Sequence, residues 1–167
     1  MNRMTEISNT AYNSIGRSTI DSTDVWHTPT YVVDFAINRW GKFDLDAAAS
    51  KQNTICKNFI SQEMDALSTE WSGNNVWLNP PYGRSMPKFI RRAKEQVDAG
   101  NVNRVVCLIA CRTDTKIFQE VIFPYASEIF FIKGRISFSG QGPANFASCY
   151  VVFDNSEEQK INYGVIR

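Results

Sequence analysis

Residues 79–82 combine groups that could hold a planar amino group. The stretch NVWLNPPYG (75–83) is a short apolar run of strand type that ends in Asn79, Pro80, Pro81 and Tyr82. The two prolines fix two φ angles and remove two backbone donors, so neither a strand nor a helix continues through them. The corner therefore presents an amide oxygen, carbonyl groups without competing donors and an aromatic ring. Such a corner can accept hydrogen bonds from an NH₂ group and stack on the ring that carries it.

A second corner, FDLDAAAS (43–50), follows another expected strand. Asp46 supplies a carboxylate there, while Ala47 and Ala48 carry side chains small enough for a ligand to approach the backbone. In open α/β sheets, ligands bind outside the carboxyl ends of the strands, which is where both corners fall. Asp46 could instead cap a following helix with its side chain.

Alternating strands and helices must position these corners, and their pattern predicts an α/β fold with a mostly parallel sheet. One helix is expected to begin with Thr28 as N-cap and Pro29 at its first position and to end at Gly41. A second helix is expected over residues 85–100, and residues 104–111, apolar on both faces, are typical of a central parallel strand. The remaining expected strands are 42–46, 56–60, 75–78, 128–138 with a break at Gly134, and 147–153.

The interval between the two corners is short. Asp46 and Asn79 are 33 positions apart, whereas two complete strand–helix units need roughly 45 residues. We therefore expect at least one element between them to be short or missing.

Composition indicates one globular domain. The chain has 167 residues, of which 43% are hydrophobic, enough for a single packed core. Residues 1–24 are rich in Ser, Thr and Asn and are expected to form a flexible arm before a single domain over 25–167. The sequence has no apolar run of transmembrane length and no signal-peptide core, which predicts a cytoplasmic protein without a membrane partner.

Charge and rare residues narrow the chemistry. Four cysteines without a CxxC pair and a single histidine, His27, argue against a metal site, and we expect reduced, mostly buried thiols. The same scarcity argues against Ser–His or Cys–His catalysis unless His27 takes part. Because the net charge is only +1, contact with nucleic acid would require basic residues gathered on one face.

Six short motifs occur in one order over roughly residues 24–153. They are WHTP (26–29), FDLDAAAS (43–50), MDAL (64–67), Trp71 with NVWLNPPYG, ACRTDT (110–115) and GRISF (134–138). This series resembles the DNA N6-adenine methyltransferase family of phages and prophages, in which NPPY after a strand is the catalytic signature. The resemblance implies a compact, Rossmann-like methyltransferase fold dependent on S-adenosylmethionine (AdoMet), with helices on both faces of the sheet. It also implies methyl transfer from AdoMet to N6 of adenine in double-stranded DNA.

The resemblance assigns catalytic roles to the first corner. Asn79 and the carbonyl of Pro80 would accept hydrogen bonds from the adenine amino group, and Pro81 belongs to the same motif. Tyr82 would stack on the base once it is extruded from the duplex. Candidates for DNA contact are the basic residues Arg84, Lys88, Arg112 and Arg135.

The cofactor-binding residues implied by the resemblance come from three segments. Thr28 and Pro29 would border the methionine end of AdoMet, and Asp46 would lie near the same group. Asp65 would accept a hydrogen bond from the adenine N6 of AdoMet. The full implied set is Trp26, Thr28, Pro29, Asp46, Ala47, Ala48, Asp65, Leu67 and Asn79.

Several alternatives stay open. The corner also suits methylation of another planar NH₂, such as cytosine N4, an RNA base or a protein glutamine, and an inactive member would only bind nucleic acid or a host protein. Asp65 could cap a short helix, and the basic residues could be the solvated side of an amphipathic helix. The common glycine-rich loop is absent. The short interval between the corners does not assign the acid that usually binds the AdoMet ribose, for which Glu63 is one candidate. The expected location is the cytoplasm of a bacterium carrying a phage or prophage, while the recognition sequence and oligomeric state are not indicated.

Overall fold

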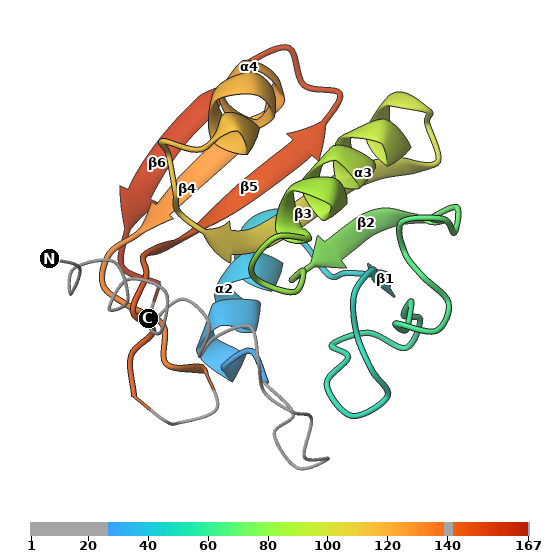
Figure 1. Ribbon diagram of the computed structural model, residues 1–167, viewed down its shortest axis with the longest axis horizontal. Helices are drawn as coiled ribbons and strands as arrows, with labels where there is room; N and C mark the ends of the chain where they lie inside the picture. Colours follow the sequence, from blue (N-terminus) through green and yellow to red (C-terminus); the bar gives the residue numbers. More distant parts are fainter. Residues whose placement is uncertain (1–26, 139–141, 167) are drawn as a thin grey trace, which may run out of the picture.

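A six-stranded sheet forms the centre of the protein (Figure 1). The computed structural model describes residues 27–138 and 142–166, so the predicted arm at 1–24 and Trp26 lie outside the described residues. The order of strands across the sheet is β1-β2-β3-β5-β4-β6. The strands are β1 (Leu45–Asp46), β2 (Gly73–Leu78), β3 (Val102–Ala110), β4 (Glu128–Ile132), β5 (Ser148–Asp154) and β6 (Lys160–Gly164).

The sheet is mixed, and one strand runs against the others. β1, β2 and β3 pair in parallel, β5 pairs antiparallel with both β3 and β4, and β6 is parallel to β4. β3 is the buried central strand that the sequence predicted, but only its β2 side is parallel, because β5 occupies the other side. The α/β class is confirmed. β6 was not expected because its residues are mostly exposed and carry no continuous apolar pattern.

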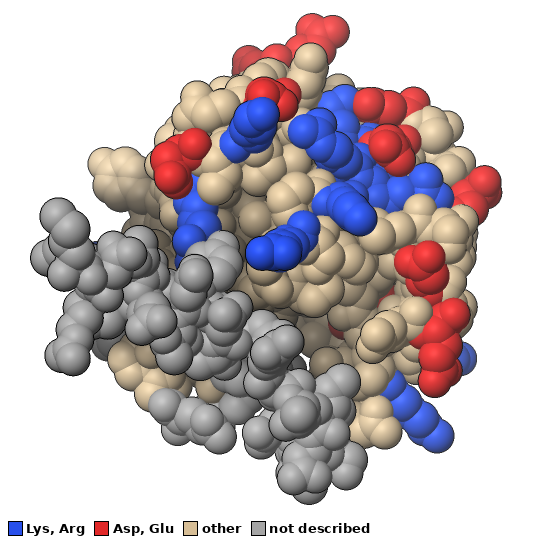
Figure 2. All heavy atoms as spheres, viewed as in Figure 1, with Lys and Arg blue, Asp and Glu red and all other residues tan. Residues whose placement is uncertain are grey.

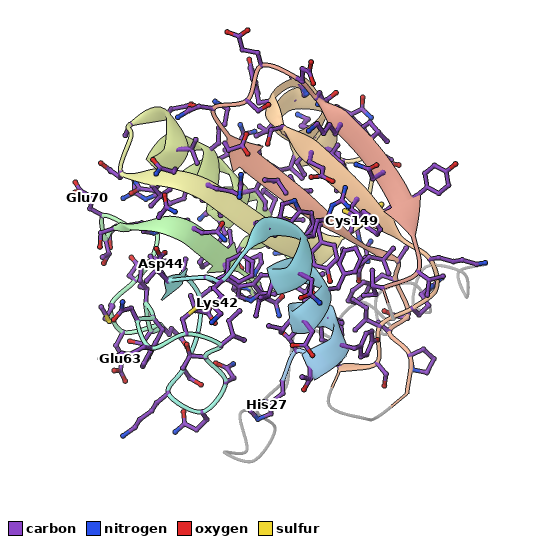
Figure 3. The ribbon with its side chains drawn as sticks, turned by 180° about the vertical axis from the view of Figure 1, so that it is seen from behind. His27, Lys42, Asp44, Glu63, Glu70 and Cys149 are labelled. Atoms are coloured by element: carbon purple, nitrogen blue, oxygen red, sulfur yellow. The ribbon has the colours of Figure 1, made fainter. Side chains whose placement is uncertain are left out.

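Helices cover both faces of the sheet. α2 (Thr30–Trp40) packs on one face, in a core that also contains Trp77 and Tyr150. α3 (Met86–Asp98), η1 (Phe118–Ile122) and α4 (Phe123–Tyr125) lie on the other face, as the opposite views in Figures 1 and 3 show. Among the described residues, no helix is long and apolar enough to span a membrane.

The start of α2 differs from the prediction. Pro29, with φ −57° and ψ 141°, is the N-cap residue, and no side chain caps this helix end. Thr28 therefore does not act as the N-cap, because its hydroxyl is used in a contact with Asn79. The helix ends before Gly41 as expected, and the φ of +90° at Gly41 is a conformation that glycine adopts without strain.

Polar side chains fix the carboxyl end of α2 on the sheet. Asn75 Nδ2 donates to the carbonyl oxygens of Trp40, Gly41 and Lys42 at 3.0–3.2 Å. The buried carboxylate of Glu128 accepts from Trp40 Nε1 at 2.9 Å and also pairs with the guanidinium of Arg39. These bonds satisfy carbonyls that a helix end leaves without partners, so this end of α2 has a defined position against β2 and β4.

The connection from β1 to β2 is irregular. Between residues 47 and 72 the structure has turns and one isolated parallel bridge, Asp46 to Phe59, but no helix or further strand. The predicted shortening of this interval is confirmed, and the strand expected over 56–60 is reduced to that single bridge. Because the bridge is parallel, residues 58–60 run in the direction of β1, and the chain after Ile60 leaves from the same edge of the sheet as Ala47.

Candidate active site

The two predicted corners lie side by side at the carboxyl edge of the parallel strands. Asp46 pairs with Trp77 across β1 and β2, and Ala47 N donates to Trp77 O at 2.9 Å. Asn79 lies two residues beyond Trp77. From a strand spacing of about 4.8 Å and a rise of about 3.3 Å per residue, the Cα atoms of Asp46 and Asn79 are about 8 Å apart. This distance lets one small molecule contact both corners.

In the Asn79 side chain, the amide nitrogen is hydrogen-bonded to a described residue and the amide oxygen is not. Its Nδ2 donates to Thr28 Oγ1 at 2.9 Å, which joins residues 51 positions apart. Its Oδ1 is buried and has no hydrogen-bond partner among the described residues. A buried acceptor without a donor is costly, so this oxygen is suited to a donor that arrives with a ligand. Sequence reasoning placed Thr28 near the site but missed this bond, because nothing local to Thr28 indicates it.

The two prolines turn the chain sharply after β2. Pro80 is buried and Pro81 is exposed, so the corner has one face in the protein and one face in solvent. Gly83 follows with φ +110°, a value that favours glycine, and α3 begins at Met86. The corner is therefore rigid at the prolines and joined directly to a helix that packs on the sheet.

Tyr82 lies in a cluster of aromatic rings. Its ring centroid is 5.1 Å from that of Phe146 and 5.9 Å from that of Phe138. The hydroxyl is buried without a partner among the described residues, and burial raises the pKa of Tyr82 well above its usual value. Tyr82 therefore stays neutral and contributes a ring rather than a base. Phe138 belongs to the GRISF motif, whereas nothing in the sequence pointed to Phe146.

Asp46 is a buried carboxylate, and no cationic side chain of the described residues pairs with it. It is 3% exposed, and its oxygens accept from Ile55 N at 3.1 Å and more weakly from Ala48 N at 3.5 Å. Burial raises the pKa of Asp46 to about 6, against the smaller opposite effect of these two N–H groups. In the described part of the chain, no Lys, Arg or His forms an ion pair with it. Asp46 does not cap a helix, because no helix follows it directly; its side chain instead accepts hydrogen bonds from N–H groups of its own loop.

Small residues directly follow Asp46 in the chain. Ala47 is fully buried, while Ala48 is partly buried and packs against the core of the α3 face. Pro29, at the start of α2, is also partly buried and follows the Thr28 that contacts Asn79. Pro29 is therefore joined to the Asn79 corner through Thr28, and the cofactor-binding role of these residues stays a prediction.

Asp65 and Leu67 lie in an exposed turn that leaves from the same edge of the sheet. Asp65 Oδ1 accepts from Leu67 N at 3.1 Å and Oδ2 from Ser68 Oγ at 2.8 Å, with the Ser68 bond lowering the pKa of Asp65 most. Its φ of +54° is unusual for a residue other than glycine. The carboxylate thus organises its own turn, and no bond joins it to Asn79 among the described residues. Glu63 is exposed nearby (Figure 3).

The basic residues after the corner fall into two groups. Arg91, Arg92 and Lys94 on α3 form ion pairs with Glu120, Glu95 and Asp98. Arg84 and Lys88 are exposed and have no ion-pair partner among the described residues. Figure 2 shows Lys and Arg gathered over the part of this face that α3 occupies, with acidic side chains among them.

The two other predicted basic residues lie on loops. Arg112 is exposed and directly follows the carboxyl end of β3. Arg135 is exposed after β4 and donates through Nη1 to Ala144 O at 3.2 Å. Both loops leave from the edge at which Asn79 lies, since β2, β3 and β4 run in the same direction.

Cysteines and histidine form no metal site in the described residues, where no group of three or more His, Cys, Asp or Glu side chains could hold an ion. His27 is exposed at the start of the described chain, away from Cys149 (Figure 3). The thiols of Cys111 and Cys149 hydrogen-bond to each other, which lowers the pKa of Cys111 and, with burial, raises that of Cys149. Cys107 is fully buried, so two of the thiols are buried and two are partly buried.

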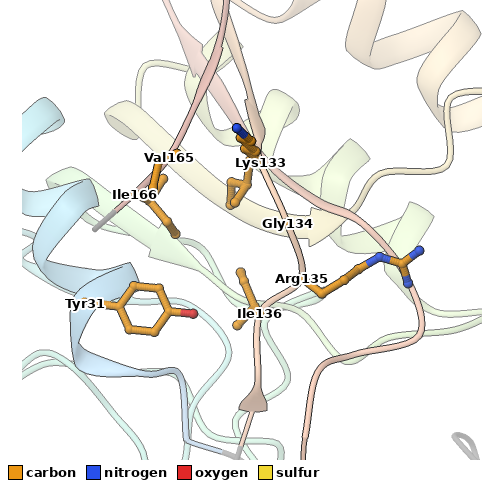
Figure 4. A pocket seen from close by; sticks show the side chains of 8 residues that line it. Tyr31, Lys133, Gly134, Arg135, Ile136, Val165 and Ile166 are labelled. Atoms are coloured by element: carbon orange, nitrogen blue, oxygen red, sulfur yellow. The ribbon is translucent and has the colours of Figure 1, made fainter.

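A pocket of about 420 Å³ lies beside the start of α2 and the ends of β4 and β6, and Asn79 is not among the residues that line it. In Figure 4 the Tyr31 ring faces Ile136, while the charged ends of Lys133 and Arg135 point outward. Isoleucine and valine side chains therefore share the lining with Lys133, Arg135 and the Tyr31 hydroxyl, so the wall of the pocket is both polar and apolar.

The fold defines a general class of protein. The chain shares its fold with the crystal structure of a modification subunit of a putative type I restriction enzyme from Vibrio vulnificus YJ016, with a TM-score of 0.56. The two chains are 13% identical, and the match covers 94% of this chain and 50% of the other. This α/β arrangement is consistent with a methyltransferase fold.

Sequence comparison identifies the family. The family model for DNA N-6-adenine-methyltransferase (Dam) matches residues 17–163, so the chain belongs to this family, as its motifs predicted. It is 36% identical over 157 residues to the DNA N-6-adenine-methyltransferase of Escherichia phage T1, covering 93% of this chain and 63% of that protein. It is also 36% identical over 116 residues to the DNA N-6-adenine-methyltransferase of Haemophilus phage HP1 (strain HP1c1), and this match covers 69% of this chain and 66% of that protein. The chain thus spans just under two thirds of the length of each of these relatives.

Proposed function

We propose that the protein transfers a methyl group from AdoMet to N6 of adenine in double-stranded DNA. The observation that carries the proposal is the buried Asn79 Oδ1, which has no partner among the described residues in the NPPY corner of a Dam family chain. An amino group donates hydrogen bonds, and Asn79 Oδ1 is an acceptor at the carboxyl edge of parallel strands, where ligands bind in α/β sheets.

The residues of the corner would position the amino group, and none of them would need to remove its proton before methyl transfer. Asn79 Oδ1 and the Pro80 carbonyl would accept its two N–H groups, which directs the nitrogen lone pair out of the base plane. Tyr82 would stack on the base after extrusion, and its raised pKa keeps it neutral. A strong base is not required, since the proton leaves as positive charge develops on nitrogen.

The cofactor side fits a cationic group. AdoMet supplies an electrophilic methyl group on a positively charged sulfonium and also carries an ammonium group. Asp46 is a buried carboxylate with a raised pKa and no cation partner in the described chain, so a bound cation would compensate its charge. Ala47 and Pro29 would border the same space. We assign Asp65 and Leu67 to the adenine end, from the motif and from the edge at which their turn leaves the sheet.

DNA would lie across the carboxyl edge of the sheet. Arg84 and Lys88 would contact phosphates beside the corner, and Arg112 and Arg135 would do so from neighbouring loops. We further propose that residues 25–167 form one catalytic domain with a Rossmann-like sheet and act in the cytoplasm of a bacterium that carries a phage. The relatives named as adenine methyltransferases come from phages, which supports this setting.

The test measures methylated nucleosides by mass spectrometry after incubation with AdoMet and duplex DNA. Wild-type protein should form N6-methyladenine, and Asn79→Ala should lower the rate about 10²-fold or more with AdoMet affinity little changed. Asn38→Ala, at an exposed position on α2, is the matched control and should keep the wild-type rate. Methylation of cytosine or of an RNA base instead would move the proposal to another planar NH₂. If calorimetry detects no AdoMet binding, the remaining alternative is an inactive family member that only binds nucleic acid or a host protein.

A further inference from the structure

The hydrogen bond between Thr28 and Asn79 joins two elements at the candidate site. Thr28 lies just before α2, and Asn79 follows β2. Thr28 Oγ1 accepts from Asn79 Nδ2 at 2.9 Å, and both side chains are partly buried. The amide oxygen at the other end of the Asn79 side chain is the buried acceptor without a partner.

We propose that Thr28 is a positioning residue that holds the Asn79 amide with its oxygen toward the amino group of the substrate. An Asn amide presents either an acceptor or two donors, depending on rotation about its last side-chain bond. In the reversed orientation both N–H groups would occupy the buried position of Oδ1, where they would face the donors of an incoming amino group. That orientation is disfavoured, since buried donors without acceptors are costly. The effect of Thr28 on methyl transfer rests on the proposed function, whereas the hydrogen bond between Thr28 and Asn79 does not.

The position of Thr28 is itself fixed by α2. Pro29 restricts the backbone directly after Thr28, and Val32, in the first turn, is fully buried. Tyr150 OH donates to Val32 O at 2.8 Å, which ties this turn to β5. A hydroxyl can donate or accept, so it would bond to either end of the amide. On this support it fixes the plane of the amide, and the buried position of Oδ1 decides which end faces Thr28, since two donors without acceptors there would cost more than one acceptor without a donor.

The bond also affects the strength of the acceptor. When Asn79 Nδ2 donates to Thr28, the amide becomes more polarised and its oxygen a better acceptor. The effect would be felt when the amino group is held for transfer, so it should appear in the rate of methyl transfer rather than in AdoMet binding.

The experiment compares Thr28→Val, which keeps the side-chain shape without the acceptor, with Thr28→Ser, which keeps the hydroxyl. Single-turnover methyl transfer should fall about 10- to 100-fold in Thr28→Val and stay within about threefold of wild type in Thr28→Ser. The dissociation constant for duplex DNA should stay within about twofold in both, and any loss of AdoMet affinity should be smaller than the loss of rate. A wild-type rate in Thr28→Val would overturn the inference. A loss of AdoMet affinity as large as the loss of rate would also overturn it, because the effect would then come entirely from the cofactor contact that the resemblance implies.

A double-mutant cycle and an NMR measurement separate positioning from a general loss of structure. In the Asn79→Ala background, Thr28→Val should cost less than about twofold in rate, because the group it positions is gone. Equal costs in both backgrounds would contradict the inference. Exchange of the Asn79 side-chain NH₂, followed by ¹⁵N NMR, should be about tenfold faster in Thr28→Val than in Thr28→Ser. Equal exchange in the two variants would likewise count against the bond. This readout needs no methylation, so an inactive wild-type protein would refute the proposed function and leave the Thr28 contact testable.

Discussion

The charge state of Asp46 should control how AdoMet affinity depends on pH. Burial raises the pKa of Asp46 from its ordinary value of 3.8 to about 6 in the folded protein. At 1.36 kcal/mol per pKa unit, ionised Asp46 costs the fold about 3 kcal/mol. Because the folded pKa is the higher one, this cost is absent below about pH 4, grows as pH rises from about 4 to about 6, and is then constant. A cation bound beside Asp46 would offset it.

The binding constant follows from the same value. If AdoMet binds only the protein with ionised Asp46, its dissociation constant is constant above about pH 7 and rises about tenfold per unit well below pH 6. At pH 5 the affinity should therefore be about tenfold weaker than at pH 7. At pH 6, where Asp46 is half protonated, binding should release about half a proton. The neighbouring thiol of Cys56 takes no part, because burial and the charges of Asp46 and Asp44 raise its pKa to about 12.

Calorimetry at pH 5.0–7.5, in pairs of buffers with different ionisation heats, measures both the affinity and the protons released. Asp46→Asn should bind AdoMet more weakly at pH 7 and should show no pH dependence in this range. His27→Gln, which replaces the single histidine, is the control and should keep the wild-type profile. A flat wild-type profile would refute the placement of a cation at Asp46. A pH dependence that persists in Asp46→Asn would do the same.

The other predictions concern the ring, the turn, the fixing of α2 and the thiols. Tyr82→Phe should keep the methylation rate within about threefold, while Tyr82→Ala should lose about 1–3 kcal/mol of base binding. A mismatch opposite the target adenine should raise the rate of Tyr82→Ala more than that of wild type, because it lowers the cost of extruding the base. An equal increase in both enzymes would argue against stacking. Asp65→Gly, which tolerates the φ of +54°, should weaken AdoMet binding about tenfold without unfolding, and unchanged affinity would exclude Asp65 from the site. Glu128→Gln should lower the free energy of unfolding by about 2–4 kcal/mol in urea, against no change in exposed Glu157→Gln. Cys111, with its lowered pKa and partial exposure, should react with iodoacetamide before buried Cys107, and the reverse order by mass spectrometry would contradict the thiol pairing.

Local patterns made much of the fold predictable. The spacing of apolar residues located α2 and α3, and the doubly apolar pattern located β3 in the centre of the sheet. Counting residues between Asp46 and Asn79 also predicted that the interval lacks complete elements, because chain length limits what can form. In each case the deciding force acts within one element or one short segment.

The features that escaped prediction depend on contacts distant in sequence. The antiparallel insertion of β5 between β3 and β4 is a pairing choice that no single strand encodes. Thr28 carries a good local signal for an N-cap, but a bond to Asn79, 51 residues away, takes its hydroxyl instead. The sequence therefore allowed candidate site residues to be proposed, whereas the hydrogen bond between Thr28 and Asn79 could not be predicted from it.

Asn75 on β2 and Asn79 just after this strand give α2 a further constraint. Asn75 holds the carboxyl end of this helix and Asn79 contacts the residue before its amino end. A single residue inserted into α2 would advance one end by about 1.5 Å and rotate it by about 100°, so the two contacts could not both be kept. The number of residues in α2 is thus set by the spacing of two side chains on and just after a neighbouring strand, and substitutions in this helix should be tolerated far better than insertions or deletions.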